Sequence, residues 1–190
     1  FADRLLAFKQ RTMQVINISS SSPNNWFVED TVYSAGVLYP YSVAKGTRGI
    51  IWANTNGVYI YNGNSVAMVS EGKISDSDWL TFSNGKQLSV GYIGSSDQAL
   101  IIQDVDSTQE AYLYDIRANA FTFADNIDPN SATLTEPPFT NFVNDSSGNL
   151  IMGYDVEGTS LGSTGANDVH FTRWVNDVGT HKVYLLESVC

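Results

Sequence analysis

The sequence is poor in the residues that covalent cross-links, metal clusters and polyanion binding require. Its 190 residues include one cysteine, Cys190, and two histidines, His170 and His181. A single thiol forms no internal disulfide, and this set has neither the number nor the spacing of zinc ligands. Lys and Arg number 10 against 20 Asp and Glu, which gives a net charge of −10. That balance argues against tight binding to a phosphate backbone or an anionic membrane, because both need clustered Lys and Arg.

Long apolar runs and a high charge fraction are also missing. No apolar stretch approaches the roughly 20 residues that a membrane-spanning helix needs. Charged residues make up 16% and aromatic residues 12%, the opposite of a disordered chain. The length suits one folded domain, or part of a larger one. Because the chain begins at Phe1 without the layout of a signal peptide, we expect it to be part of a longer polypeptide.

What the sequence contains is a recurring run of β-branched and aromatic residues, closed each time by Gly, Asn, Asp or Ser. Helical periodicity is hard to find. Asn54-Thr55-Asn56-Gly57 and Asn62-Gly63-Asn64 separate three such runs and predict tight hairpins with type I′ turns. The runs predict β-strands over 5–8, 13–18, 26–33, 49–53, 58–61, 66–69, 88–93, 99–103, 111–115, 120–123, 139–143, 150–154, 169–174 and 183–186.

These strands recur in units of about 40–50 residues. Tyr61-Asn62, Tyr114-Asp115 and Tyr154-Asp155 each close a strand and lie 53 and 40 residues apart. Four-stranded units of this length are typical of β-propeller blades. We therefore predict an all-β fold, a β-propeller of four-stranded antiparallel blades. About three to four blades fill the segment, over 1–36, 37–80, 86–126 and 138–190.

Two strands read as continuously apolar, without the alternation of a strand that is exposed on one face. They are Ile50-Ile51-Trp52 and Val58-Tyr59-Ile60-Tyr61, which predicts burial on both faces. The inner strands of a propeller blade are buried in this way. A β-sandwich gives a similar pattern and is the alternative fold.

The candidate catalytic and metal-ligating residues all have structural explanations. His170 alternates with apolar neighbours as a strand residue does, and His181 has no cysteine to pair with. Asp76-Ser77-Asp78 and Asp104-Val105-Asp106 lack the further ligands of a calcium loop and suit turns or helix caps. The 20 acids would supply a glycosidase pair only by chance. We predict no catalytic residues, no cofactor site, no metal site and no enzymatic activity.

The aromatic and basic clusters also suit structural roles. We expect core packing of the four tryptophans, although they could also line a sugar or peptide pocket. Lys45-Gly46-Thr47-Arg48 is the densest basic stretch, and we expect a solvated turn there. The tryptophans are Trp26, Trp52, Trp79 and Trp174.

Several stretches, read in order, resemble a known family. They comprise a Trp-Phe-x-Glu strand, Pro-Tyr-Ser-Val, a Gly-hydrophobic-Trp strand and an Asn-Gly hairpin, all within 24–63. DRLLAFKQRTMQVINIS precedes them at 3–19, and EGKISDSDW and EAYLYDIRANAFTF follow at 71–79 and 110–123. This succession resembles the β-propeller tail proteins of short-tailed bacteriophages, called packaged-DNA stabilisation, tail-hub or nozzle proteins. The resemblance extends over 3–154 and more loosely over 171–186.

The resemblance implies a structural virion protein of the phage tail. Such proteins form an oligomeric ring below the portal, contact portal, adaptor and other tail proteins, retain packaged DNA and conduct it at ejection. DNA would pass through without specific binding, and no membrane span is implied. The alternatives are an extracellular ligand-sensing or carbohydrate-binding propeller, which predicts a membrane span or signalling module elsewhere, and a carbohydrate-active enzyme, which predicts two carboxylates converging in a central pocket.

Overall fold

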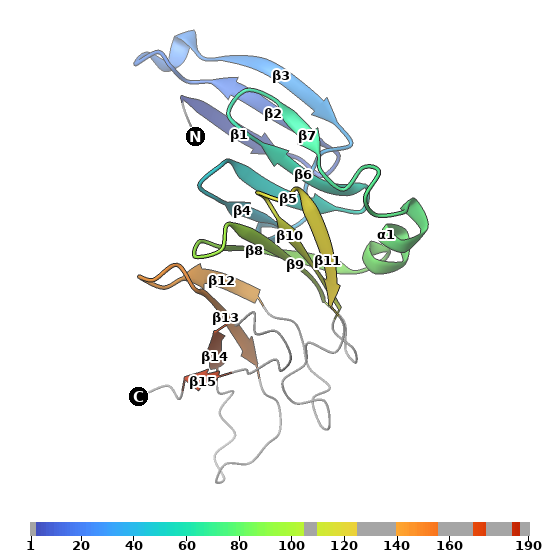
Figure 1. Ribbon diagram of the computed structural model, residues 1–190. Helices are drawn as coiled ribbons and strands as arrows, with labels where there is room; N and C mark the ends of the chain where they lie inside the picture. Colours follow the sequence, from blue (N-terminus) through green and yellow to red (C-terminus); the bar gives the residue numbers. More distant parts are fainter. Residues whose placement is uncertain (1–2, 105–109, 125–139, 156–168, 174–183, 187–190) are drawn as a thin grey trace.

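The described part of the chain consists mainly of antiparallel β-sheets that follow one another in sequence. The computed structural model describes residues 3–104, 110–124, 140–155, 169–173 and 184–186. These residues form four separate sheets of three or four strands, and one α-helix (α1, Asp76–Ser83). The sheets are stacked in chain order from the N-terminal end to the C-terminal end (Figure 1). The prediction of an all-β class is therefore confirmed at this level.

Each sheet is a meander in which every strand pairs with the one that follows it in the sequence. Sheet 1 has three strands: β1 (Arg4–Phe8), β2 (Thr12–Asn17) and β3 (Phe27–Tyr33). Sheet 2 has four: β4 (Val43–Lys45), β5 (Ile50–Asn54), β6 (Gly57–Tyr61) and β7 (Val66–Met68). Sheet 3 has β8 (Gln87–Ile93), β9 (Gln98–Asp104), β10 (Ala111–Asp115) and β11 (Ala120–Ala124). Sheet 4 has β12 (Thr140–Asn144), β13 (Leu150–Asp155), β14 (Val169–Arg173) and β15 (Tyr184–Leu186).

The first strands of the four-stranded sheets are neighbours in space. β8 contacts both β4 and β12, so the three sheets meet along their first strands. The chain passes from the last strand of each sheet to the first strand of the next. Short 3₁₀ turns at Pro23–Asn25 and Pro40–Ser42 lie in the connections on either side of β3.

The hydrophobic cores lie between neighbouring sheets. Successive side chains of a strand point to opposite faces of its sheet, so one strand can contribute to two cores. In β5, Ile51 and Ala53 belong to the core shared with sheet 3, whereas Trp52 belongs to the core shared with sheet 1. In β9, Ile101 faces sheet 2, and Leu100 joins a core with Leu150 of sheet 4. Sheets 2 and 3 are therefore buried on both faces. For sheet 2, this confirms the burial predicted from the continuously apolar strands at 50–52 and 58–61.

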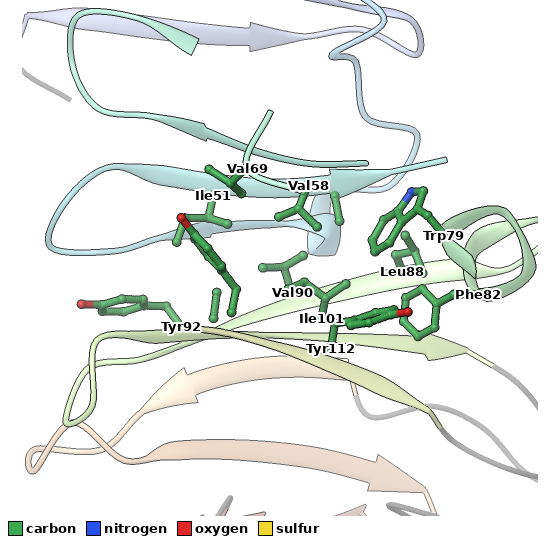
Figure 2. Close-up of a cluster of buried hydrophobic side chains, with 13 residues drawn as sticks. Ile51, Val58, Val69, Trp79, Phe82, Leu88, Val90, Tyr92, Ile101 and Tyr112 are labelled. Atoms are coloured by element: carbon green, nitrogen blue, oxygen red, sulfur yellow. The ribbon is translucent and has the colours of Figure 1, made fainter. Parts of the chain in front are cut away.

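The largest core fills the space between sheets 2 and 3 (Figure 2). Ile51 and Val58 of sheet 2 point toward Val90 and Ile101 of sheet 3. At one end of this layer, α1 contributes the rings of its two buried aromatic residues, Trp79 and Phe82. Each fully buried aliphatic side chain of this core stabilises the fold by roughly 1.5–3 kcal/mol.

Two elements differ from the sequence prediction. The segment Asp76–Ser83 forms a helix where only turns or caps were expected. Two helical turns are too few for a clear period, but Ser75 caps the helix by accepting a hydrogen bond from the Asp78 amide (3.1 Å). The cap is therefore Ser75, directly before the acidic cluster, and Asp76 and Asp78 of the cluster lie in the first turn of the helix. The three-residue strand β4 was also missed, since Val-Ala-Lys is too short and too polar to stand out.

Two details of the predicted hairpins and repeat were wrong. Both Asn-rich hairpins form, but Asn56 and Asn64 keep negative φ, so the turns are not type I′. Side-chain oxygens of Asn54 and Asn62 accept backbone amide hydrogen bonds within these turns and supply an alternative closure. In the repeat, Tyr61 and Tyr114 end the third strands of their sheets, whereas Tyr154 lies on the second strand of sheet 4.

Candidate functional site

A cavity of about 380 Å³, lined by both polar and apolar groups, lies where sheets 1, 2 and 3 meet. Its walls come from four places in the sequence: the β1–β2 turn, the connection from β3 to β4, the β5–β6 turn and the start of β8. Cavities of this size suit small ligands. The lining residues are Gln10, Arg11, Ser34, Leu38, Tyr39, Ser42, Ala53, Asn54, Thr55, Asn56, Lys86 and Leu88.

Neutral hydrogen bonds hold the wall between sheets 1 and 2. The Asn54 side-chain amide donates to the carbonyls of Ser34 (2.9 Å) and Gly36 (2.8 Å), and the Asn56 amide also donates to Ser34 (2.9 Å). Gly36 lies against the β1–β2 turn so closely that a Cβ there would stand 2.3 Å from the Lys9 carbonyl oxygen. The position therefore requires glycine, and the asparagines are occupied with positioning the wall.

The charged groups of the cavity are both cations. Arg11 is exposed at its rim, and Lys86 donates a hydrogen bond to the Gln103 side-chain oxygen. Gln103 in turn donates to the Glu110 carboxylate (2.5 Å). Among the described residues, neither Arg11 nor Lys86 has a carboxylate oxygen within 4.0 Å. Because its described lining contains no carboxylate, the cavity lacks the paired acids that glycoside hydrolysis needs.

An aromatic pair stands beside the cavity. The rings of Tyr39 and Tyr41 stack with centroids 5.3 Å apart and planes 8° apart. Tyr41 also donates a hydrogen bond to the side-chain oxygen of Gln87, at the start of β8. The stack therefore connects the approach to β4 with sheet 3, and one of its two residues, Tyr39, lines the cavity.

A buried carboxylate joins sheets 2 and 3 at the opposite ends of their strands. Asp97, in the β8–β9 turn, is 3% exposed. It accepts hydrogen bonds from the Tyr92 hydroxyl (2.8 Å) and from Nε of Arg48 (2.6 Å) in the β4–β5 turn. Nε of Arg117 in the β10–β11 turn is 3.3 Å away, and the Thr47 hydroxyl donates at the same distance. We call these five residues the Asp97 cluster.

The environment of Asp97 favours its ionised form. Burial by itself raises the pKa of this carboxyl group, but the hydrogen bonds from Tyr92, Arg48 and Arg117 outweigh it. The net result is a pKa below the usual value for Asp. Arg48 and Arg117 keep 55% and 68% of their side chains exposed, so they remain hydrated while they neutralise the carboxylate. The cluster is a structural contact between sheets 2 and 3. Lys45, Thr47 and Arg48 are exposed, so the solvated turn predicted at Lys45–Arg48 is confirmed, and Arg48 pairs with Asp97 in addition.

The tryptophans differ in their surroundings. Trp52 is completely buried, stacks on Tyr59 (5.6 Å between centroids) and donates a hydrogen bond to the Ala35 carbonyl (2.9 Å). Trp79 is 4% exposed and packs in the core between sheets 2 and 3. Core packing is therefore confirmed for these two. It is wrong for Trp26, which is 43% exposed, and Trp174 lies outside the described residues.

None of the remaining sequence candidates that the structure describes lines the cavity. Of His170 the structure describes the backbone alone, paired with Tyr154 on β13. His181, Cys190 and the 105–106 part of the second acidic cluster lie outside the described residues. Within the described ranges, no group of three or more His, Cys, Asp or Glu side chains could hold a metal ion. Sequence reasoning missed the cavity because nothing in the separate turns signals that they meet.

Comparisons with known proteins leave the family undefined. The chain matches no protein-family model, no curated protein and no solved structure. In the part of the chain that the structure describes, no helix has the length and apolar character needed to cross a bilayer. The class that the geometry defines is therefore a β-rich protein of stacked antiparallel sheets.

Proposed function

We propose that the four sheets are consecutive blades of a β-propeller, and that the chain is a segment of a structural protein of a short-tailed phage tail, a nozzle, hub or DNA-stabilisation component. The carrying observation is the stacking of the sheets in chain order, with β4, β8 and β12 adjacent. Blades packed around a common axis have this arrangement. The order of sequence motifs over residues 3–154 supports the family.

Burial on both faces supports blades over a β-sandwich. In a sandwich of two sheets, each sheet buries one face against the other. Sheets 2 and 3 instead have a core on each side, and the three cores involved each contain a fully buried residue, namely Trp52, Ile101 and Leu100. The connections from the last strand of one sheet to the first strand of the next also suit blades.

The proposed role is mechanical. The protein forms part of an oligomeric ring in the virion, contacts the portal, adaptor and other tail proteins, retains packaged DNA and conducts it at ejection. The net charge of −10 supports this role, because a conduit should repel the phosphate backbone. No catalytic residue, cofactor or metal takes part in the proposal.

Mass spectrometry of purified phage particles and of isolated tails tests the proposal. We expect peptides of this chain in both fractions, at a copy number that matches a ring. Particles assembled without the protein should package DNA and then lose it. Absence of the chain from the particles, or full DNA retention by particles that lack it, would contradict the proposed role.

A separate test concerns the conduit. We expect no gel shift of duplex DNA at low salt, since proteins that bind DNA through phosphates release counterions and bind best there. Micromolar binding that weakens steeply as salt is added would refute the repulsive channel.

The cavity favours one second candidate, an extracellular ligand-sensing or carbohydrate-binding propeller. Tyr39 offers an aromatic side chain of the kind on which sugar rings stack, and Gln10, Arg11 and Thr55 line other walls of the same cavity. Glycan-array binding that disappears in Tyr39→Ala would favour this candidate. No binding across the array, with the chain present in virions, would reject it.

A further inference from the structure

The cavity between sheets 1, 2 and 3 differs in charge from the chain as a whole. The chain has 20 acidic residues against 10 basic ones, yet the two charged residues that line the cavity are Arg11 and Lys86. Among the described residues, neither cation has a carboxylate oxygen within 4.0 Å. The lining therefore carries positive charge in an acidic protein, and a cleft lined by one sign of charge concentrates ions of the opposite sign.

A buried amide holds Lys86 in place. Gln103 on β9 is 1% exposed, and its side-chain oxygen accepts a hydrogen bond from the Lys86 ammonium group. The amide nitrogen of Gln103 donates to the Glu110 carboxylate, so that this carboxylate is paired with Gln103. An ammonium group has three donor protons. Lys86 can therefore keep its bond to Gln103 and still donate to a ligand.

The turn that carries Arg11 is fixed by its backbone. The Ser34 amide donates to the Arg11 carbonyl (2.8 Å), and the Val37 amide donates to the Lys9 carbonyl (2.9 Å). Gly36 packs against the same turn, where a Cβ would stand 2.5 Å from the Arg11 nitrogen. Within the described ranges, the Arg11 guanidinium group makes no hydrogen bond or ion pair. A guanidinium fork on a fixed turn suits bidentate binding of a carboxylate or phosphate group.

The rest of the lining suits a small hydroxylated ring. Tyr39 contributes an aromatic side chain that is held by its stack on Tyr41. The side chains of Gln10 and Thr55 are exposed and have no hydrogen-bond partner among the described residues. Small-molecule cavities of about 300–1,000 Å³ typically combine apolar or aromatic groups with a few polar ones. At about 380 Å³, this cavity fits the lower end of that range.

We propose that the cavity binds an anionic sugar. Arg11 and Lys86 hold the carboxylate or phosphate group of this ligand, the Tyr39 ring packs against the sugar ring, and Gln10 and Thr55 bind hydroxyl groups. The inference rests on the second candidate function, the ligand-binding propeller, and names its ligand class. It is independent of the proposed role in the phage tail.

Isothermal titration calorimetry on the full chain tests the ligand class. The probes are glucuronate, which carries a carboxylate, glucose 6-phosphate, which carries a phosphate, and neutral glucose. We expect at least one of the two anions to bind with a dissociation constant of about 1 mM. Glucose should bind at least about tenfold more weakly, because it lacks the charged hydrogen bonds. The anion that binds more tightly identifies the acidic group that the cavity prefers.

Two variants and a matched control test the proposed contacts. Arg11→Gln and Lys86→Gln should each weaken binding of the anion by about tenfold. Lys9→Gln is the control, because Lys9 is an exposed cation in the same turn that does not line the cavity. It should change binding by less than about twofold. Circular dichroism and the unfolding temperature check that the variants fold. Since the Arg11 side chain has no partner in the described structure, its variant tests the ligand contact even if Lys86→Gln disturbs Gln103.

Three results would overturn the inference: no binding of either anion at about 10 mM, equal binding of glucose, or an equal loss of binding in Lys9→Gln. Binding of neutral glycans that disappears in Tyr39→Ala, with no binding of either anion, would support the second candidate function and overturn the inference about its ligand. Detection of the chain in virions tests the tail role alone.

Discussion

The two interfaces on either side of sheet 2 are built with different chemistry. Toward sheet 1, Trp52 fills the space between the sheets, and side chains of Trp52, Asn54 and Tyr59 donate to backbone carbonyls of residues 34–36. All of these groups are uncharged at neutral pH. Toward sheet 3, a comparable apolar core is supplemented by the ionised Asp97 cluster.

The same stacking of sheets is thus supported by two kinds of polar contact. Neutral hydrogen bonds to the backbone keep their strength across the pH range and are little screened by salt. A carboxylate that is ionised in the folded state makes stability depend on pH. We therefore expect the sheet 1–sheet 2 interface to be insensitive to acid and the sheet 2–sheet 3 interface to weaken in it.

The largest expected effect comes from Trp52→Ala. The side chain is completely buried, stacks on Tyr59 and meets Phe8 edge to face with centroids 5.2 Å apart. Its removal should lower the free energy of unfolding by about 3–5 kcal/mol. The loss should be the same at pH 7 and pH 4 in denaturant titrations. A loss below 1 kcal/mol would mean that the two sheets do not depend on this ring.

Asp97→Asn should have the second-largest effect, at the interface between sheets 2 and 3. Loss of the charge at a buried, hydrogen-bonded carboxylate should lower the free energy of unfolding by about 2 kcal/mol at neutral pH. Because the folded pKa is depressed, the stabilisation by Asp97 is complete above the unfolded pKa of about 3.9 and is lost as pH falls through the folded value. The difference between wild type and variant should therefore shrink below about pH 4.

Asp30→Asn is the control for this pH dependence, since Asp30 is exposed on β3. It should leave the pH profile of the free energy of unfolding nearly unchanged. If Asp97→Asn lowered stability equally at pH 7 and pH 3, the Asp97 carboxylate would not be the source of acid sensitivity.

Asn54→Ala should have a smaller effect and tests the neutral hydrogen bonds between sheets 1 and 2. The side chain donates to the backbone carbonyls of Ser34 and Gly36 and accepts a hydrogen bond from the backbone amide of Asn56 (2.8 Å). Each such neutral hydrogen bond contributes about 1 kcal/mol or less when part of the site can be reached by water, so we expect a total loss of about 1–2 kcal/mol. Thermal unfolding in low and high salt should show the same loss. A strong salt dependence would contradict the neutral character of this interface.

Arg117→Ala should have the smallest effect. Its side chain is 68% exposed and its Nε is 3.3 Å from Asp97, so the ion pair should be worth no more than about 0.5–1 kcal/mol. The loss should disappear in high salt, as measured by urea titration. A loss as large as that of Asp97→Asn would show that Arg117 is the principal partner of the carboxylate, in place of Arg48 and Tyr92.

Strands and hairpins could be predicted from the sequence because their causes are local. Runs such as Val58–Tyr61 and the Asn-rich turns on either side of it define strand, turn and strand without reference to the rest of the chain. Short elements could not be predicted because a periodic pattern needs several residues to become visible. β4 has only three residues, and α1 completes only two turns.

The polar sites could not be predicted because they join distant residues. Asp97 meets Arg48, 49 positions before it, and Arg117, 20 positions after it. The cavity likewise combines Arg11 with Lys86 across three sheets. Only the stacking of the sheets brings these turns together. Trp26 shows the converse case, since this tryptophan was expected in the core but is exposed directly before β3.

The most direct test of the account is a cryo-electron microscopy reconstruction of the full-length protein in its native assembly. We expect a ring in which the four sheets are arranged radially as blades, with β4, β8 and β12 nearest the propeller axis. Asp97 should be ion-paired between the second and third sheets. A stable 20.8 kDa monomer, or sheets folded as a two-layer sandwich, would contradict it.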